Sequence, residues 1–356
     1  MTINIRATEA STTAEPLDIL ALYRIMATAR VTNDIMKIRK TQGRFPFYIG
    51  CAGHESMAAV AAALNQDDWM ALYYRDLAAW LQRTGDIYGP FREAYSRTTG
   101  PMCAGRNMPS HYSSKRHRIL PTFSEVGALA PFAGGVGFSL KWHKTKDIIM
   151  FSIGDGGVAT NDFNVLFRQA AVHKLPILIV VEDNAWAITT PSAIQWEGSL
   201  VDWAKGGGVY AEEVDGTNAM ATYEASVRLV DHVRSGQGPV LMHLRLGLLD
   251  PHSSSTDIRA YRTKEEIELT MATKDPVKNF GHCWSKMDIS RKVISSVSAR
   301  RFEPNWKALR PRFYKSLNQQ PSVSCTMSST FPNGRRISRE EQKSSCLCWA
   351  QSTKPW

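Results

Sequence analysis

The sequence lacks long hydrophobic runs and has few cysteines. No part of its 356 residues approaches the roughly 18 uncharged apolar residues of a membrane-spanning helix, so we expect no membrane partner. Only Cys51 and Cys103 precede residue 283, which excludes a disulfide framework in that region. The first residues lack the apolar core and cleavage site of a secretory signal. We therefore expect a cytoplasmic protein.

The net charge of +10 is confined to one end of the sequence. Of the 43 basic residues 14 lie in 283–356, and of the 33 acidic residues 4 do, so residues 1–282 hold 29 of each sign. A neutral body gives no electrostatic indication of a nucleic-acid partner. The tail 283–356 is basic, rich in serine and cysteine and without periodicity. We expect it to be disordered or translated out of frame, with a functional basic tail as the alternative, and we expect residues 1–16 to be flexible.

Between these ends, residues 17–282 read as one domain in which helices come first and strands then alternate with helices. Buried strands are predicted from residue 147 and at 175–184, a short strand near 208–213 and a further strand at 239–246. Helices are predicted at 17–41, 54–64, 75–83, 126–142, 162–173, 199–205 and 218–235, with loops over 84–123. This alternation predicts an α/β fold: a mostly parallel sheet with helices on both faces, plus N-terminal helices.

Polar residues follow two of the predicted strands. Asp155 lies between glycines after the first, and Asn184 ends the second, one strand–helix–strand unit later. Ligands of open parallel sheets bind beyond the carboxyl ends of the strands. The match of 154–159 to G-x-G-x-x-A permits a dinucleotide site with Glu182 on the ribose, although Glu182 comes 28 residues after Gly154 rather than about 20.

The negative charge of Asp155 favours a diphosphate bound together with a metal ion over a bare diphosphate. A phosphate oxygen about 4 Å away would be repelled by roughly 4 kcal/mol at an effective dielectric of 20, more than a helix N-terminus returns. Mg²⁺ held by the oxygens of Asp155 and Asn184 reverses the sign of this interaction. Gly156 and Gly157 would let the diphosphate approach the following helix.

Seven segments in order give this site a more specific setting. They are FYIGCAGHESMAAVAAAL (47–64), YYRD (73–76), GRNMPSHYSS (105–114), EDNAWAITTP (182–191), VDGTN (214–218), GQGPVL (236–241) and PHSSSTDIRAYRTKEE (251–266). Together they resemble the alpha subunit of the decarboxylating component of 2-oxoacid dehydrogenases. The GR-MP-H pattern is closer to the branched-chain, 2-oxoisovalerate type than to the pyruvate type.

The resemblance implies a thiamine-diphosphate-binding fold with Mg²⁺, and a role for each matching residue. Tyr74 and Arg75 would bind the diphosphate, and Ser124 and the main chain of Val126 would face the aminopyrimidine. Asp155, Asn184 and the carbonyl of Trp186 would ligate Mg²⁺, beside Gly154, Gly156 and Gly157. His252 would be catalytic, at the thiazolium.

Some positions depart from the family. Glu182 stands where the branched-chain type has an arginine that helps hold the diphosphate, and Asp183 replaces the first asparagine of the family pair. Trp186 replaces a tyrosine. Residues 124–129 lack the threonine and glutamine that bind potassium in some members. Outside the motif, His54 and His243 are expected to be structural and His111 to line the active-site mouth.

The resemblance also implies partners. A glutamate that activates thiamine comes from a beta subunit in two-chain members, so we expect a beta subunit, in a heterotetramer, and a lipoyl-bearing acyltransferase core. The implied reaction is oxidative decarboxylation of a small-molecule 2-oxoacid, such as 3-methyl-2-oxobutanoate, with acyl transfer to lipoyl. Alternatives are a pyruvate or acetoin dehydrogenase alpha subunit, an NAD-dependent oxidoreductase and a non-catalytic remnant.

Overall fold

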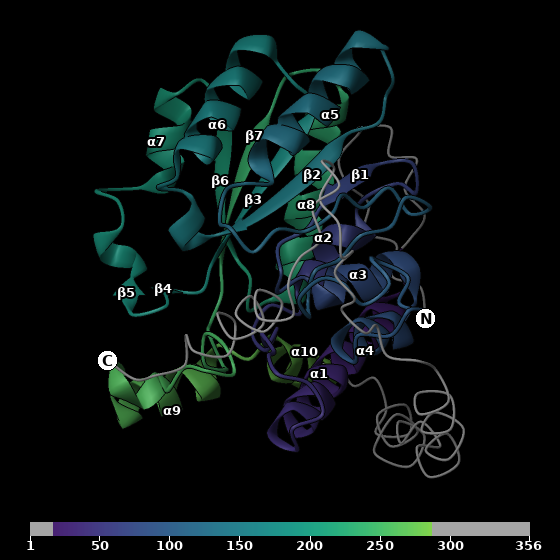
Figure 1. Ribbon diagram of the computed structural model, residues 1–356. Helices are drawn as coiled ribbons and strands as arrows, with labels where there is room; N and C mark the ends of the chain where they lie inside the picture. Colours follow the sequence, from purple (N-terminus) through teal and green to yellow (C-terminus); the bar gives the residue numbers. More distant parts are fainter. Residues whose placement is uncertain (1–16, 287–356) are drawn as a thin grey trace, which may run out of the picture. The chain divides into compact units, whose positions relative to one another are not determined.

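A parallel sheet carries the predicted site in the computed structural model, which describes residues 17–286 and side chains as far as Gly281. Within this range the sheet has five strands in the order β1-β2-β3-β7-β6, and all neighbours are parallel (Figure 1). The strands are β1 (Trp69–Ala71), β2 (Ile149–Gly154), β3 (Ile177–Asp183), β7 (Val240–Arg245) and β6 (Tyr210–Asp215). β3 is therefore central. The predicted flexible N-terminus 1–16, and the predicted tail from residue 287 on, lie outside the described residues.

Alternate residues of β3 enter different cores. Leu178 and Val180 pack into one cluster, and Ile177, Ile179 and Val181 into the other; each of the five is 0% exposed. The second cluster lies under α5 (Ala130–Trp142), α6 (Asn161–His173) and α7 (Leu200–Gly206). The first lies under α2 (Met57–Ala62) and α8 (Ala219–Arg234), beside α1 (Ile19–Thr41) and α3 (Leu77–Thr84). The predicted fold class, a parallel sheet with helices on both faces and helical material before it, is confirmed.

Side-chain caps fix the helices that lead away from the sheet edge. Thr160 accepts from the Phe163 N–H at the start of α6, directly after the turn that ends β2. Asn218 accepts from Met220 and Ala221 at the start of α8, after β6. The caps fix the first residues of α6 and α8. The polar turns between the strands and these helices therefore stay outside the helices, at the edge of the sheet.

The structure adds short elements that the sequence did not predict. They are β1, α4 (Tyr88–Ala94), the hairpin β4 (Trp186–Ala187) and β5 (Thr190–Pro191), α9 (Lys264–Thr273) and α10 (Pro276–Lys286). β1 is too short to show alternation, and α9 has no buried residue that would mark an apolar face. α5 begins at Ala130 rather than at residue 126, with Pro131 in its first turn, where proline is tolerated. α10 extends past residue 282, the predicted end of the folded domain. No helix in the described part of the chain is long and apolar enough to cross a membrane.

Candidate active site at the carboxyl ends of β2 and β3

Asp155 lies directly beyond β2. The chain leaves the strand at Gly154 and makes a single 3-10 turn, η1 (Asp155–Gly157), before α6 begins. The side chain is 2% exposed, and Gln195 Nε2 donates to Oδ2 over 2.7 Å. Burial, and then the charge of Asp183, raise the pKa of Asp155 to about 6. A cation beside this carboxylate would offset that loss of hydration.

Asn184 follows β3, and its amide is held on two sides. The Trp186 N–H donates to Oδ1 over 3.1 Å, and Nδ2 lies 3.0 Å from His54 Nε2. Gly154 of β2 pairs with Glu182 of β3, so Asp155 and Asn184 follow neighbouring strand ends. They therefore lie at the same edge of the sheet.

The two polar residues that end β3 face different partners. Glu182 is 0% exposed, and its Oε2 lies 2.6 Å from His54 Nδ1. Asp183 turns toward β7, where its Oδ2 lies 3.0 Å from His243 Nε2 and accepts from Arg245 Nη1 over 2.7 Å. Although burial opposes ionisation, these two partners hold the pKa of Asp183 below its usual range.

Tyr74, Arg75 and His252 form a second group. Arg75 is 1% exposed; Nη1 donates to the Gly50 carbonyl over 2.7 Å, and Nη2 donates to the His252 carbonyl over 2.9 Å. Nη2 also lies 3.2 Å from His252 Nδ1. Because arginine only donates, Nδ1 accepts and the neutral imidazole carries its proton on Nε2. Burial, and then Arg75, lower the pKa of His252 to about 4, which keeps the ring neutral.

Tyr73 lies between the two groups. Its ring centroid is 4.0 Å from that of Tyr74 and 6.4 Å from that of His54. A Cβ placed on Gly154 would lie 2.6 Å from the Tyr73 hydroxyl oxygen. The phenol therefore covers the end of β2 at Gly154.

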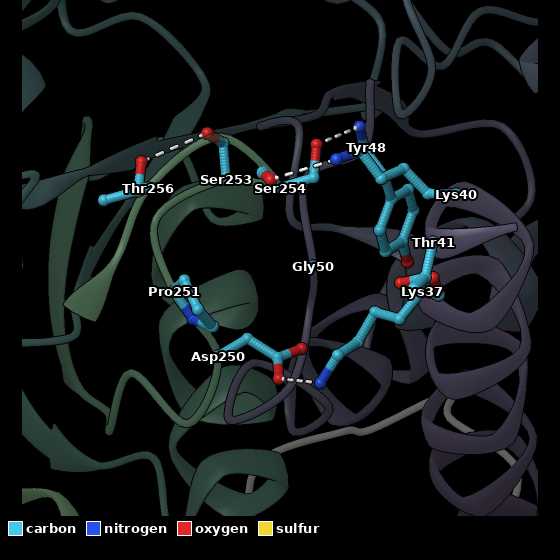
Figure 2. A pocket seen from close by; sticks show the side chains of 10 residues that line it. All are labelled: Lys37, Lys40, Thr41, Tyr48, Gly50, Asp250, Pro251, Ser253, Ser254 and Thr256. Carbon is cyan, nitrogen blue, oxygen red and sulfur yellow. Dashed lines mark hydrogen bonds and ion pairs between the residues drawn. The ribbon is translucent and has the colours of Figure 1, made fainter. Parts of the chain in front are cut away.

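The loop that carries His252 is fastened to α1. Asp250 accepts from Asn33 Nδ2 over 2.9 Å and from Lys37 Nζ over 2.5 Å. Lys40 Nζ donates to the carbonyl of Ser254 over 3.2 Å. Figure 2 shows Lys37, Lys40, Asp250 and Ser254 around a cavity of about 160 Å³ between the helix and the loop. These contacts hold both flanks of His252 in place.

Ser124 and Val126 lie at the approach to α5. Ser124 Oγ is 2.5 Å from His111 Nε2. Val126 is 48% exposed, and its Cβ lies 3.8 Å from a Cβ placed on Gly157. Val126 is therefore beside the turn after β2, whereas Ser124 contacts His111.

Six of the predicted residues thus fall into two groups, with Tyr73 between them, while Ser124 and Val126 lie at the approach to α5. Asp155, Asn184 and Trp186 gather at the ends of β2 and β3, and Tyr74, Arg75 and His252 surround the anchored loop. Tyr73 and Gln195 had no predicted role, and His54 was expected to be structural. Tyr73 lies in segment 73–76 and His54 in segment 47–64, two of the segments that carry the family resemblance. The sequence could have indicated a role for them only as polar or aromatic neighbours of predicted site residues. Gln195, 40 residues from Asp155, carried no signal.

The residues present fit thiamine diphosphate with Mg²⁺. A carboxylate, an amide oxygen and a main-chain carbonyl are oxygen donors of the kind that Mg²⁺ prefers. Arg75 Nε is buried with no hydrogen-bond partner among the described residues. A Cβ on Gly156 would lie 2.6 Å from the Cβ of Ala187, so the turn and β4 close on each other without a side chain between them. No group of three or more His, Cys, Asp or Glu side chains that could hold a metal ion is found in the described residues.

The fold is that of an α/β protein with a parallel sheet, and the candidate site lies at the carboxyl edge of that sheet. Comparison with known sequences narrows this class. The Dehydrogenase E1 component family matches residues 23–295. The chain belongs to this family, which depends on thiamine diphosphate.

The curated relatives agree. The 2-oxoisovalerate dehydrogenase subunit alpha of Bacillus subtilis (strain 168) is 33% identical over 251 residues, 69% of this chain and 76% of that protein. The mitochondrial 2-oxoisovalerate dehydrogenase subunit alpha 1 of Arabidopsis thaliana is 32% identical over 278 residues, 76% of this chain but only 59% of that protein. The pyruvate dehydrogenase E1 component subunit alpha of Acholeplasma laidlawii is 31% identical over 268 residues, 74% of each chain. The resemblance to branched-chain alpha subunits is confirmed.

Proposed function

We propose that this protein is the alpha subunit of a decarboxylating 2-oxoacid dehydrogenase component of the branched-chain type. It would carry out oxidative decarboxylation of a 2-oxoacid such as 3-methyl-2-oxobutanoate and pass the acyl group to lipoyl on an acyltransferase core. The observation that carries the proposal is the buried carboxyl of Asp155 beside Asn184 at the shared edge of β2 and β3. A carboxylate at this buried position needs a compensating positive charge, which a divalent cation would supply.

Each group of residues would have its own task. Asp155, Asn184 and the Trp186 carbonyl would hold Mg²⁺, and Tyr74 and Arg75 would face the diphosphate. The cofactor, when bound, supplies the electron sink that makes loss of CO₂ feasible. The protein's own contribution to proton movement would come from His252, whose Nε2–H points away from Arg75 and can donate to the 2-oxoacid or to the lipoyl group.

The beta subunit would dock on the exposed apolar face of α5 and α6. Phe132 is 57% exposed, Phe138 48%, Trp142 74% and Val172 75%, an unusual set of large apolar side chains at the surface. α5 and α6 lie side by side on one face of the sheet (Figure 1), and Phe138, Trp142 and Val172 line a surface groove of about 570 Å³. The half-exposed Val126 beside η1 lies on the approach to this helix. A partner seated here could reach the cofactor with the glutamate that this chain lacks.

The direct test is decarboxylation of 3-methyl-2-oxobutanoate by the full chain with its beta subunit, Mg²⁺ and thiamine diphosphate. Turnover that needs all components supports the proposal. If the chain binds NADH and not thiamine diphosphate, the proposal is wrong and the NAD-dependent oxidoreductase is the function to test. That alternative is weakened by Glu182, which is fully buried against His54 and cannot reach a ribose. A chain that binds neither cofactor nor beta subunit would be a non-catalytic remnant.

Pyruvate is the second candidate substrate. It is favoured by the Acholeplasma laidlawii relative, whose identity and coverage are close to those of the branched-chain relatives. Running pyruvate and 3-methyl-2-oxobutanoate in parallel distinguishes the two. A kcat/KM at least about tenfold higher for the branched acid, or about 1.4 kcal/mol of selectivity, supports the branched-chain assignment.

A further inference from the structure

A line of buried polar side chains runs behind the proposed metal site. Asp76, Glu182 and His54 are 0% exposed, and Asn184 is 2% exposed. Glu182 Oε2 lies 2.6 Å from His54 Nδ1, and His54 Nε2 lies 3.0 Å from Asn184 Nδ2. At the other end, Asp76 Oδ2 accepts from the Tyr73 N–H over 2.9 Å. The four side chains connect the strand end that carries Asn184 to the segment that carries Tyr74 and Arg75.

The donor and acceptor properties of the side chains determine the direction of each hydrogen bond in this line. The Trp186 N–H needs an acceptor, so the oxygen of the Asn184 amide faces it and the nitrogen faces His54. The amide nitrogen only donates, so His54 Nε2 accepts and the imidazole proton is on Nδ1. That proton is donated to Glu182 Oε2. The other tautomer would set two donors against each other across 3.0 Å.

The remaining carboxyl groups lie at the far end of the line. Glu182 Oε1 and Asp76 Oδ1 are buried, and neither has a hydrogen-bond partner among the described residues. The two carboxyl groups interact with each other. Asp76 is held in turn by the hydroxyl of Ser152, which donates to its Oδ2.

We propose that His54 and Glu182 are positioning residues for Asn184: their hydrogen bonds, anchored on Asp76, hold the amide so that Oδ1 faces Mg²⁺. This inference rests on the proposed function. It gives a role to the departure at position 182, where the branched-chain type has an arginine that helps hold the diphosphate. In this chain the acid turns away from the diphosphate and supports a metal ligand from behind. Its effect is therefore on the metal rather than on the phosphates.

The tautomer of His54 can be measured directly, without cofactor. The full chain with ¹⁵N-labelled histidine rings is compared with His54→Gln to assign the His54 signals in long-range ¹H–¹⁵N spectra. We expect the Nδ1–H form in the wild type. Glu182→Gln should keep it, because the Gln oxygen accepts from Nδ1–H and its NH₂ group donates to Asp76. Glu182→Leu should lose it. An Nε2–H ring at His54 in the wild type overturns the inference.

Metal affinity provides the second readout. Mg²⁺ binding in the presence of thiamine diphosphate is measured by calorimetry for the wild type, Glu182→Gln and Glu182→Leu. We expect Glu182→Leu to weaken Mg²⁺ at least about tenfold, as loss of a ligand's supporting hydrogen bonds commonly does, and Glu182→Gln to stay within about twofold. Equal affinity for Glu182→Leu and wild type overturns the inference. A wild-type chain that binds no cofactor overturns the proposed function instead. In that case, or if Glu182→Leu fails to fold, the His54 tautomer of the wild type still tests the inference.

Discussion

Arg75 Nη2 lies 2.9 Å from the carbonyl oxygen of His252 and 3.2 Å from its Nδ1, so one guanidinium group fixes both the main chain and the ring of the proposed catalytic histidine. The arrangement determines the tautomer and suppresses protonation. It also joins His252 to Gly50, because Nη1 of the same arginine donates to the Gly50 carbonyl. The imidazole is therefore available as a neutral donor through Nε2.

The first prediction concerns pH. The folded-state pKa of His252 is lowered to about 4 by burial and by Arg75, whereas an unfolded chain titrates near 6.5. On acidification from pH 6.5 the unfolded state binds the proton first, so the free energy of unfolding falls between about pH 6.5 and 4 and levels off below. Denaturant unfolding of the wild type and His252→Asn across this range measures the effect. The loss should be smaller in His252→Asn; equal pH dependence would contradict the lowered pKa.

The second prediction concerns the fastening of the His252 loop. Lys37→Met removes the contact with Asp250 that lies two residues before the histidine. Lys37 is 44% exposed, so we expect a stability loss of at most about 1 kcal/mol, but faster hydrogen exchange over 250–256 and lower kcat. Lys37→Arg should restore most of the protection. Lys205→Met, at an exposed position on α7, is the control and should change neither.

The third prediction concerns the metal. Asp155→Ala removes the one carboxylate of the proposed ligand set and should weaken thiamine diphosphate and Mg²⁺ at least about tenfold in calorimetry. Removing Mg²⁺ with a chelator should have the same effect on the wild type. Asp162→Ala changes an exposed aspartate in the first turn of α6 and serves as the matched control. Full cofactor affinity in Asp155→Ala would show that the site assignment is wrong.

The fourth prediction concerns the backbone next to His54. Gly53 has φ +100°, and a Cβ there would lie 1.8 Å from the carbonyl oxygen of Gly247. Gly53→Ala should therefore lower the free energy of unfolding by about 3 kcal/mol or more, from both strain and overlap. Gly43→Ala, at φ +68° with nothing within 4 Å, isolates the conformational part and should cost about 1 kcal/mol. Similar melting temperatures for the two variants would contradict the overlap.

The fifth prediction concerns the beta subunit. Trp142→Lys places a charge in the exposed apolar face of α5, where the side chain is 74% exposed. The chain should fold normally but fail to form a complex with the beta subunit in sedimentation experiments. Leu269→Lys, which changes a 64% exposed side chain on α9, should leave assembly intact. Normal assembly of Trp142→Lys would exclude this face as the docking surface.

Local sequence patterns were sufficient to predict four of the five strands of the parallel sheet in the described residues, and the carboxyl edge of that sheet. β2 and β3 are continuous apolar runs because both of their faces are covered, and the polar residues that end these runs follow neighbouring strand ends. The contact between His54 and Glu182 spans 128 residues and could not be predicted from spacing. α4 and β1 were missed because elements of seven and three residues are too short for a periodic signal.

Tyr73 and Gln195 show why the site itself was only partly predictable. Both reach the strand ends from segments that the sheet topology brings together, and neither residue type is specific to metal or phosphate chemistry. Asp155 could be recognised because a negative charge after a glycine-rich strand end needs an explanation. A phenol or an amide in the same place does not.

The end of β3 limits how this site can change over time. Glu182, Asp183 and Asn184 are consecutive and buried, and they face His54, His243 and the ligand edge in turn. Deleting one residue in the strand would set Asp183 against His54, and inserting one would set Val181 there. The site can therefore change by paired substitutions, at positions 182 and 54 or at positions 183 and 243, but not by insertion or deletion of a residue. Related proteins should differ here at both positions of a pair, with the spacing between the positions unchanged.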